Sequence, residues 1–307
     1  MKRQEQSLKI GNTPLIEFTR LQAETGALAR IFGKAEYENA GGSIKDRVAQ
    51  AIIQDAEEKG KLKPGGIVVE ATSGNTGIGL ALVAKVKGYR AVIFMPSTMS
   101  KERQELIKSF GGEVVLTDGT KGMQGAVEEA QAFVHKTENS VLAGQFDNPV
   151  CVEAHYQTTA PEIYDALNGE VDILVAGVGT GGTLTGIGKY LKEKNPKIRV
   201  VAVEPYHSPL LSQGVAGKHG LQGIGANFIP SILDRSIYDE VQTVTEEDAF
   251  YWAKKLRKVE NAFVGISAGA GVCVAMRLAM QEENREKRIV VILPDGGDRY
   301  LSVENFI

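Results

Sequence analysis

The residue whose setting most clearly indicates a chemical role is Lys45, in the segment NAGGSIKDR that spans residues 39–47. Two glycines precede it, and a helical pattern begins at its position. A lysine amine must lose its proton before it can attack a carbonyl carbon. A helix N-terminus, neighbouring Arg47 and burial all disfavour the ammonium form, whereas Asp46 favours it. Most lysines lie on solvated surfaces, but this setting favours an amine that can form a Schiff base.

A first glycine-rich turn, with the sequence SGNTG, covers residues 73–77 and follows the apolar run 67–72. Such a turn exposes backbone N–H groups where a helix begins, and a helix N-terminus favours anions. Ser73, Asn75 and Thr76 add polar side chains. Ser73 or Asn75 as a simple N-cap is the alternative interpretation, but a cap alone does not require both glycines.

A second turn, with the sequence GTGGT, covers residues 179–183 and follows the apolar run 172–179. Its glycines can bring N–H groups close to a phosphate, and its two threonines can donate from the side. The wider string 177–182 also fits the GxGxxG pattern of dinucleotide-binding proteins, with Glu204 as the ribose-binding acid. A nicotinamide dehydrogenase is therefore a rival interpretation, but it leaves Lys45 and the first turn unexplained.

A third turn, with the sequence GISAG, covers residues 265–269 and opens the last long helix. Its polar side chain, Ser267, is either an N-cap or a partner of a bound group. Taken alone, the turn favours the cap.

Short β-branched runs alternate with longer helical patterns along the whole chain. Strands are predicted at 67–72, 91–96, 113–117, 172–179, 199–205 and 288–295, and helices at about 45–59, 77–87, 101–110, 122–137, 154–168, 181–194, 246–259 and 268–283. Apolar strands separated by helices indicate parallel sheets that are covered on both faces. Ligands bind beyond the carboxyl ends of such strands, where the glycine-rich turns lie.

The composition is that of an ordinary globular protein of 307 residues, with 43% hydrophobic and 24% charged residues and a net charge of -3. Neither a basic run nor a long apolar stretch is present, so we expect neither a nucleic-acid nor a membrane partner. The N-terminus lacks the apolar core of a signal peptide. Two isolated cysteines and four dispersed histidines favour a reduced, cytoplasmic setting without a metal site.

Seven ordered motifs resemble those of the cysteine synthase and cystathionine β-synthase family, which uses pyridoxal 5'-phosphate (PLP). They cover residues 10–14, 41–47, 72–77, 145–149, 179–183, 223–230 and 295–302. The resemblance implies an α/β fold of the tryptophan-synthase-β-like type II, with two doubly wound, mostly parallel sheets flanked by helices. The expected smaller domain is 39–148, with a mobile part at about 97–137. The larger domain is 1–38 plus 149–307.

The resemblance also implies a role for each matching residue. Lys45 looks like the residue that forms the Schiff base with PLP and then removes the α-proton. The phosphate would be held by Gly179, Thr180, Gly181, Gly182 and Thr183. Asn75 and Ser267 look like the partners of the pyridine hydroxyl and the ring nitrogen. The pocket for the substrate carboxylate would consist of Thr72, Ser73, Thr76 and Gln145.

The reaction implied is β-replacement on O-acetyl-L-serine or L-serine through α-aminoacrylate, with sulfide as the nucleophile and L-cysteine as the product. A cystathionine β-synthase that takes homocysteine, with release of hydrogen sulfide from cysteine as a side activity, is the alternative. A serine or threonine dehydratase and a non-catalytic scaffold are weaker ones. Asn227 is either a contact of the nucleophile or a turn residue. The resemblance further implies a homodimer and, as a partner, serine acetyltransferase.

Overall fold

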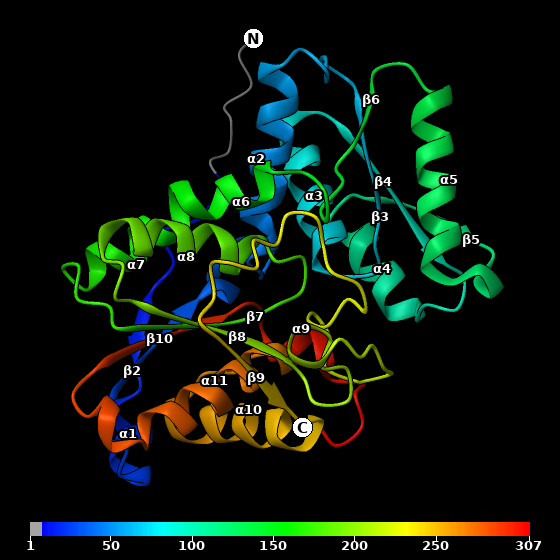
Figure 1. Ribbon diagram of the computed structural model, residues 1–307. Helices are drawn as coiled ribbons and strands as arrows, with labels where there is room; N and C mark the ends of the chain where they lie inside the picture. The colour runs from blue at the N-terminus through cyan, green and yellow to red at the C-terminus, as the bar shows by residue number, and fades with distance from the viewer. Residues whose placement is uncertain (1–7) are drawn as a thin grey trace. The chain divides into compact units, whose positions relative to one another are not determined.

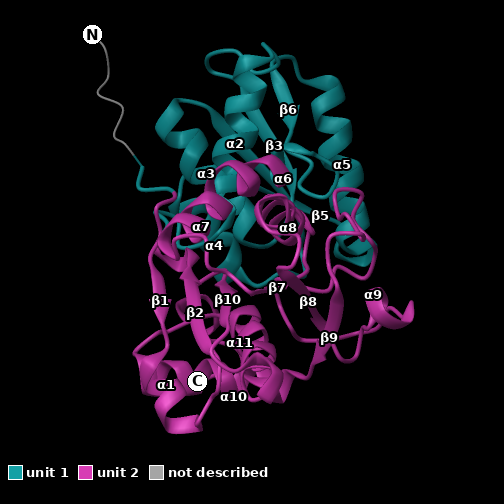
Figure 2. Ribbon diagram, turned by 60° about the vertical axis from the view of Figure 1, so that its left-hand side comes forward, with its two compact units in different colours: residues 1–10, 39–151 teal, residues 11–38, 152–307 magenta. Residues whose placement is uncertain are grey.

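The computed structural model describes residues 8–307, which form two compact units (Figure 2). Unit 1 contains the residues up to Ile10 and Asn39–Cys151, and unit 2 contains Gly11–Glu38 and Val152–Ile307. No helix in residues 8–307 is long and apolar enough to cross a membrane.

Unit 1 is built on a four-stranded parallel sheet with the order β5-β4-β3-β6. The strands are β3 (Ile67–Ala71), β4 (Arg90–Pro96), β5 (Glu113–Thr117) and β6 (Ser140–Leu142). The two central strands, β3 and β4, are buried along almost their whole length. That burial explains their continuous apolar sequence.

Helices cover both faces of the unit 1 sheet (Figure 1). They are α2 (Lys45–Glu58), α3 (Asn75–Lys87), α4 (Lys101–Ser109) and α5 (Gly122–Lys136), with a 3-10 turn at Gly119–Lys121. On one face, Val69 and Phe94 pack against Ala126 and Ala130 of α5. Helix α3 approaches the start of α2 closely, because a Cβ at Gly79 would lie 3.0 Å from the Lys45 carbonyl oxygen.

Unit 2 is built on a six-stranded sheet with the order β1-β2-β10-β7-β8-β9. The strands are β1 (Leu15–Glu17), β2 (Arg30–Ala35), β7 (Ile173–Gly177), β8 (Arg199–Pro205), β9 (Glu240–Val244) and β10 (Arg288–Leu293). Strand β1 pairs antiparallel with β2, and the other pairs are parallel.

The helices of unit 2 lie on opposite faces of this sheet (Figure 1). They are α1 (Thr19–Thr25), α7 (Ala160–Ala166), α8 (Gly182–Lys194), α9 (Leu210–Gln213), α10 (Glu246–Glu260) and α11 (Ile266–Ala279), with 3-10 turns at Glu36–Glu38, Glu282–Asn284 and Gly297–Tyr300. Helix α11 is buried along almost its entire length, and its side chains join those of β7 and β10 in the main core. Helices α7 and α8 lie on the other side.

The predicted class, α/β with two mostly parallel sheets flanked by helices, is confirmed. The sequence did not predict β1, β2, β6, β9 or α1. Strand β2 was missed because its buried Lys34 interrupts the apolar pattern; the Lys34 ammonium is paired with Glu162 at 2.6 Å. The helix predicted at 154–168 is divided into α6 (Val150–Ala154), a π-helical turn (His155–Thr159) and α7.

Candidate active site

Lys45 is the first residue of α2 and is partly buried. Burial lowers the pKa of its amine, while the nearby Cys151 and Glu70 oppose that shift. The glycines before it are structurally required. Gly42 has a φ of 77°, and a Cβ at Gly41 would lie 2.5 Å from an Asp46 carboxylate oxygen. Asp46 accepts a hydrogen bond from the Gly41 N–H at 2.6 Å, so it shapes the loop that leads to Lys45.

The predicted carboxylate-binding turn joins β3 to α3. Its N-cap is Gly74, with no hydrogen bond from a capping side chain, so the N-cap interpretation of Ser73 and Asn75 is wrong. The Thr72 hydroxyl instead accepts from the Gly74 N–H at 3.2 Å. The Ser73 carbonyl accepts from the Arg103 guanidinium at 3.1 Å. Both contacts hold the backbone of the turn and leave the Ser73 hydroxyl outside the helix cap.

Gln145 meets this turn although it lies far along the chain. The buried Thr76 hydroxyl donates a hydrogen bond to Gln145 Oε1 at 2.6 Å. Because a carbonyl oxygen cannot donate, the Thr76 proton is used in this contact. The Gln145 amide N–H groups are then the donors of the pair that remain for an anion.

Sequence reasoning missed Glu70, which lies on β3 two residues before Thr72 and is 5% exposed. Its carboxylate accepts from the backbone N–H of Ala71 at 2.9 Å and of Gln145 at 3.2 Å. Burial raises the pKa of Glu70 to about 7, against the opposing effect of those backbone donors. Cys151 is also buried, and desolvation raises its pKa to about 11, so its thiol is protonated and unreactive at neutral pH.

The predicted phosphate loop joins β7 to α8 in unit 2. Its first glycine, Gly179, lies so close to the backbone of Gly223 that a Cβ would lie 2.4 Å from the Gly223 carbonyl oxygen. Gly181 has a φ of 84°, and a Cβ there would lie 2.7 Å from Leu233 Cβ. Any larger residue at either position would displace the loop. A phosphate could therefore come close to the backbone N–H groups at the N-terminus of α8, which begins at Gly182 and carries a partial positive charge.

A second missed residue, His155, touches the last residue of this loop. Its Nε2 lies 3.2 Å from the Thr183 hydroxyl, and its Nδ1 lies 3.0 Å from the Thr159 hydroxyl. The histidine is 1% exposed and belongs to the π-helical turn. It orients the Thr183 hydroxyl, and its position 28 residues upstream hid it from the sequence motif.

Ser267 is the second residue of α11 and is buried. The N-cap of the helix is Gly265, without a capping side chain, so the prediction that favoured Ser267 as the cap is wrong. A Cβ at Gly223 would lie 3.6 Å from the Ser267 hydroxyl oxygen. The 223–225 segment therefore lies beside both Ser267 and the phosphate loop.

Asn227 is exposed and has a left-handed backbone, with a φ of 63°. Its Oδ1 accepts a hydrogen bond from the Ser208 hydroxyl at 2.7 Å. These features show the turn role directly. Contact with a nucleophile stays a prediction, for which the Asn227 amide N–H groups are the candidate donors.

The predicted site residues fall into two groups, one in each unit. Lys45, Thr72, Ser73, Asn75, Thr76 and Gln145 belong to unit 1, and the phosphate loop, Asn227 and Ser267 belong to unit 2. The family profile described as "Pyridoxal-phosphate dependent enzyme" matches residues 6–295. The chain belongs to this family.

Relatives support a closer placement within the PLP-dependent enzymes. A cysteine synthase of Staphylococcus aureus (strain N315) is 46% identical over 295 residues, covering 95% of this chain and 94% of the relative. The crystal structure of O-acetyl serine sulfhydrylase isoform 3 from Entamoeba histolytica matches with a TM-score of 0.94 and 44% identity, covering 99% of this chain and 92% of that one. A hydrogen sulfide-producing enzyme from Fusobacterium nucleatum matches with a TM-score of 0.90 and 40% identity, covering 95% and 98%.

The residues present fit PLP, the cofactor of the family. A phosphate group needs a close backbone approach, which Gly179 and Gly181 provide. A Schiff base needs a neutral amine, and burial lowers the pKa of Lys45 in that direction. The dinucleotide alternative fits less well. Glu204, its ribose-binding acid, already accepts from the N–H groups of Leu211 and Ser212 at 2.7 and 3.1 Å.

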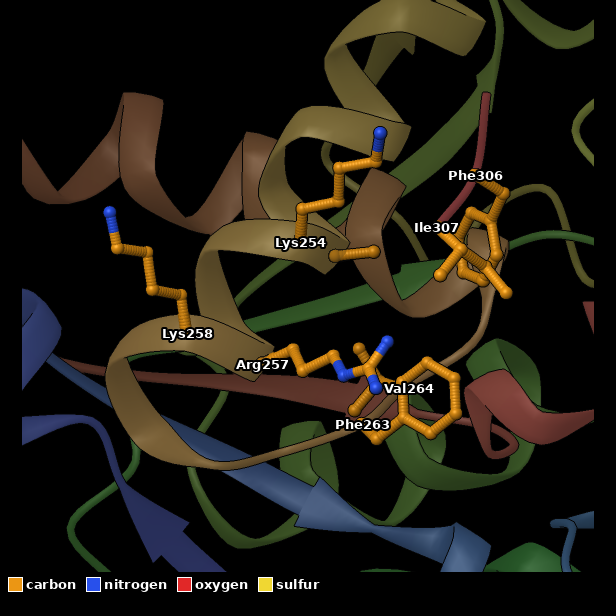
Figure 3. Close-up of a pocket in the computed structure, with 8 residues that line it drawn as sticks. Lys254, Arg257, Lys258, Phe263, Val264, Phe306 and Ile307 are labelled. Carbon is orange, nitrogen blue, oxygen red and sulfur yellow. The ribbon is translucent and has the colours of Figure 1, made fainter. Parts of the chain in front are cut away.

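A pocket of about 370 Å³ lies elsewhere in unit 2, beside α10 (Figure 3). It is lined by Ala253, Lys254, Arg257, Lys258, Phe263, Val264, Phe306 and Ile307. None of the predicted site residues lines it. The Arg257 guanidinium stacks on the Phe263 ring at 4.2 Å, and the Lys254 and Lys258 side chains point in different directions. The pocket therefore lacks converging polar groups and is not the candidate active site.

Proposed function

We propose that the protein is a PLP-dependent enzyme that replaces the acetoxy group of O-acetyl-L-serine with sulfide, giving L-cysteine and acetate. The observation that carries this proposal is the similarity to cysteine synthase over 95% of the chain. The glycine-rich turns, Lys45 and the Thr76–Gln145 pair support it independently. The purified protein, loaded with PLP, should form cysteine from O-acetyl-L-serine and sulfide.

PLP, when bound, supplies an electron sink for the charge that develops at the substrate α-carbon. Lys45 would hold the cofactor through Nζ and, once the substrate amine replaces it, would take the α-proton at the same atom. A base must be neutral to accept a proton, and burial favours the neutral form of Lys45. This one residue can therefore serve in both steps.

The substrate carboxylate would bind at the start of α3. The Thr76 hydroxyl already donates to Gln145 Oε1, so we assign the direct donor role to the Gln145 amide. The Ser73 hydroxyl and the Thr72 region would complete the pocket. Binding the carboxylate here fixes which bond at the α-carbon faces Lys45, which favours proton removal over competing reactions.

The remaining residues would orient the cofactor. Asn75 would donate to the ring hydroxyl, and residues 179–183 would bind the phosphate, with Thr183 held by His155. Ser267 would face the ring nitrogen with a neutral hydroxyl. A hydroxyl cannot act as the counter-ion of a protonated ring as an aspartate can, so the electron sink is weaker. Loss of a β-leaving group is then favoured over transamination.

A second candidate is the use of homocysteine, giving cystathionine, or the release of hydrogen sulfide from cysteine. The similarity to a hydrogen sulfide-producing enzyme at 40% identity favours testing it. Initial rates should be measured with both donors, O-acetyl-L-serine and L-serine, against both nucleophiles. A high rate with homocysteine and a negligible rate with sulfide would reverse our ranking.

We further propose a cytoplasmic homodimer that can bind serine acetyltransferase. The family resemblance supports the dimer and the partner, and the free thiols of Cys151 and Cys273 fit a reducing compartment. Light scattering should give twice the 33.0 kDa chain mass. Within the smaller domain, 39–148, we propose that residues 97–137 move when substrate binds.

A further inference from the structure

Glu70 is a buried titratable group that the proposed mechanism does not use. Ionised glutamates are rarely buried at 5% exposure without a paired cation. An apolar residue at this position of β3 would avoid the desolvation that opposes ionisation of Glu70. A group that opposes stability in this way is typical of functional sites.

The partners of the Glu70 carboxylate indicate what it does. One oxygen accepts from the N–H of Ala71, on its own strand, and the other accepts from the N–H of Gln145, 75 residues later. The Gly144 N–H is also a donor to this carboxylate. Glu70 therefore ties the end of β3 to the turn that follows β6.

The turn has further bonds, and one of them reaches β3, because the Ala143 N–H donates to the Val69 carbonyl at 2.8 Å. Gly144 has a φ of 65°, and its carbonyl accepts from the N–H groups of Asp147 and Asn148 at 3.0 and 2.8 Å. Asn148 Nδ2 donates to the Ala143 carbonyl at 3.0 Å. These bonds shape the turn and fix Ala143 to β3, whereas the backbone N–H of Gln145 itself is bonded to the Glu70 carboxylate.

We propose that Glu70 is a positioning residue that fixes the Gly144–Gln145 turn and thereby aims the Gln145 amide at the substrate carboxylate. The inference rests on the proposed function, because it assigns that carboxylate to Gln145. The Gln145 side chain is held from one end by Thr76 and its backbone from the other by Glu70. Both anchors are needed to keep the amide N–H groups in one direction.

Two substitutions test this positioning role of Glu70. Glu70→Ala removes both acceptors, and Glu70→Gln keeps the shape but leaves a single acceptor oxygen. We expect the dissociation constant of L-serine, followed by the absorbance of the PLP-loaded enzyme, to rise about tenfold in Glu70→Ala and less in Glu70→Gln. Binding of ethanolamine, which is serine without its carboxylate, should change less than twofold in either variant. The KM for O-acetyl-L-serine should rise by a larger factor than kcat changes, because Glu70 also acts on the pKa of Lys45.

The matched control is Glu204→Gln. Glu204 is also buried at the end of a strand and accepts backbone N–H groups, but from α9. Its substitution should leave L-serine affinity within about twofold of the wild-type value, since it removes comparable buried contacts that do not involve Gln145.

A second measurement needs neither cofactor nor substrate. In the apoprotein, amide exchange at residues 143–148 should be about tenfold faster in Glu70→Gln than in the wild type, while α10 exchanges at an unchanged rate. If both Glu70 variants exchange amide protons at 143–148 at the wild-type rate, the positioning role of Glu70 is wrong. The same holds if both variants bind L-serine with wild-type affinity. If the wild-type protein makes no cysteine, the proposed function fails, and the exchange experiment still decides the role of Glu70.

Discussion

At the scale of single residues, Lys45 has two proposed roles, since one amine would hold the cofactor and move the α-proton. Lys45→Ala should lower kcat for cysteine formation by at least roughly a thousandfold, because both the covalent hold and the base are lost. Stopped assays of cysteine formation measure this directly. Lys59→Ala is the control, since Lys59 lies exposed at the end of the same helix and pairs with Asp55. Full activity in Lys45→Ala would end the proposed mechanism.

The sequence predicted those residues whose role depends on a local sequence pattern. Glycine spacing pointed to residues 73–77 and 179–183, and the structure shows why Gly179 and Gly181 accept no larger residue. Glu70 and His155 were missed, because their partners lie 75 and 28 residues away and only the fold brings them together. Taken alone, the turn at 265–269 favoured Ser267 as a cap, and this was wrong, because the local sequence does not distinguish a serine inside the first turn of a helix from one at the N-cap.

At the scale of elements, the β7–α8 loop should tolerate no side chain at its first glycine. In Gly179→Ala, the new Cβ would lie 2.4 Å from the Gly223 carbonyl oxygen, so the backbone must shift. We expect the dissociation constant of PLP to rise about tenfold, which corresponds to about 1.4 kcal/mol. Titration of the apoprotein with PLP, followed by absorbance, measures the change.

The contrasting variant is Gly177→Ala, two residues earlier. Its Cβ would lie 2.6 Å from a methyl group of Ile224, which is a side-chain atom rather than a backbone atom. This variant should lose stability through overpacking, by about 1–3 kcal/mol, but keep most of its PLP affinity. Equal losses of affinity in both variants would contradict the role of the loop as a phosphate cradle.

The segment 97–137, which includes α4, β5 and α5, should respond to substrate as one element. Arg103 of α4 donates to the Ser73 carbonyl in the carboxylate-binding turn, so a shift of that turn reaches α4 through a direct contact. We expect slower amide exchange across 97–137 when L-serine is added to the PLP-loaded enzyme. Arg103→Ala should weaken this response, and unchanged exchange in the wild type would count against the movement.

The elements were predicted best where their apolar pattern was long. Strand β3 and helix α5 were found close to their observed positions, whereas β6 has three residues and gives no pattern to detect. Strand β2 was not predicted for a different reason. Its Lys34 has the residue type of a surface position. The ion pair with Glu162, 128 residues away, and a hydrogen bond to the Thr13 carbonyl at 2.6 Å make its burial possible.

At the scale of the whole molecule, the unfolding of unit 2 can be compared with the unfolding of the whole chain. Trp252, the one tryptophan of the sequence, lies on α10 in unit 2, so its fluorescence reports that unit. Far-UV circular dichroism reports both units. Coinciding transitions would show that the chain unfolds cooperatively, which is the condition for assigning a single free energy of unfolding.

That free energy should depend on pH through Glu70. Burial raises the pKa of its folded state to about 7 from an ordinary value of 4.5, so between these values the folded protein binds the proton more strongly than the unfolded chain. The contribution of Glu70 to stability is therefore complete below about pH 4.5 and is lost as the pH rises through about 7. Glu70→Gln lacks this titration. The stability of the wild type relative to Glu70→Gln should fall by up to about 3 kcal/mol across this range, as measured by urea unfolding. Parallel pH profiles for the two proteins would show that Glu70 is not desolvated as its burial implies.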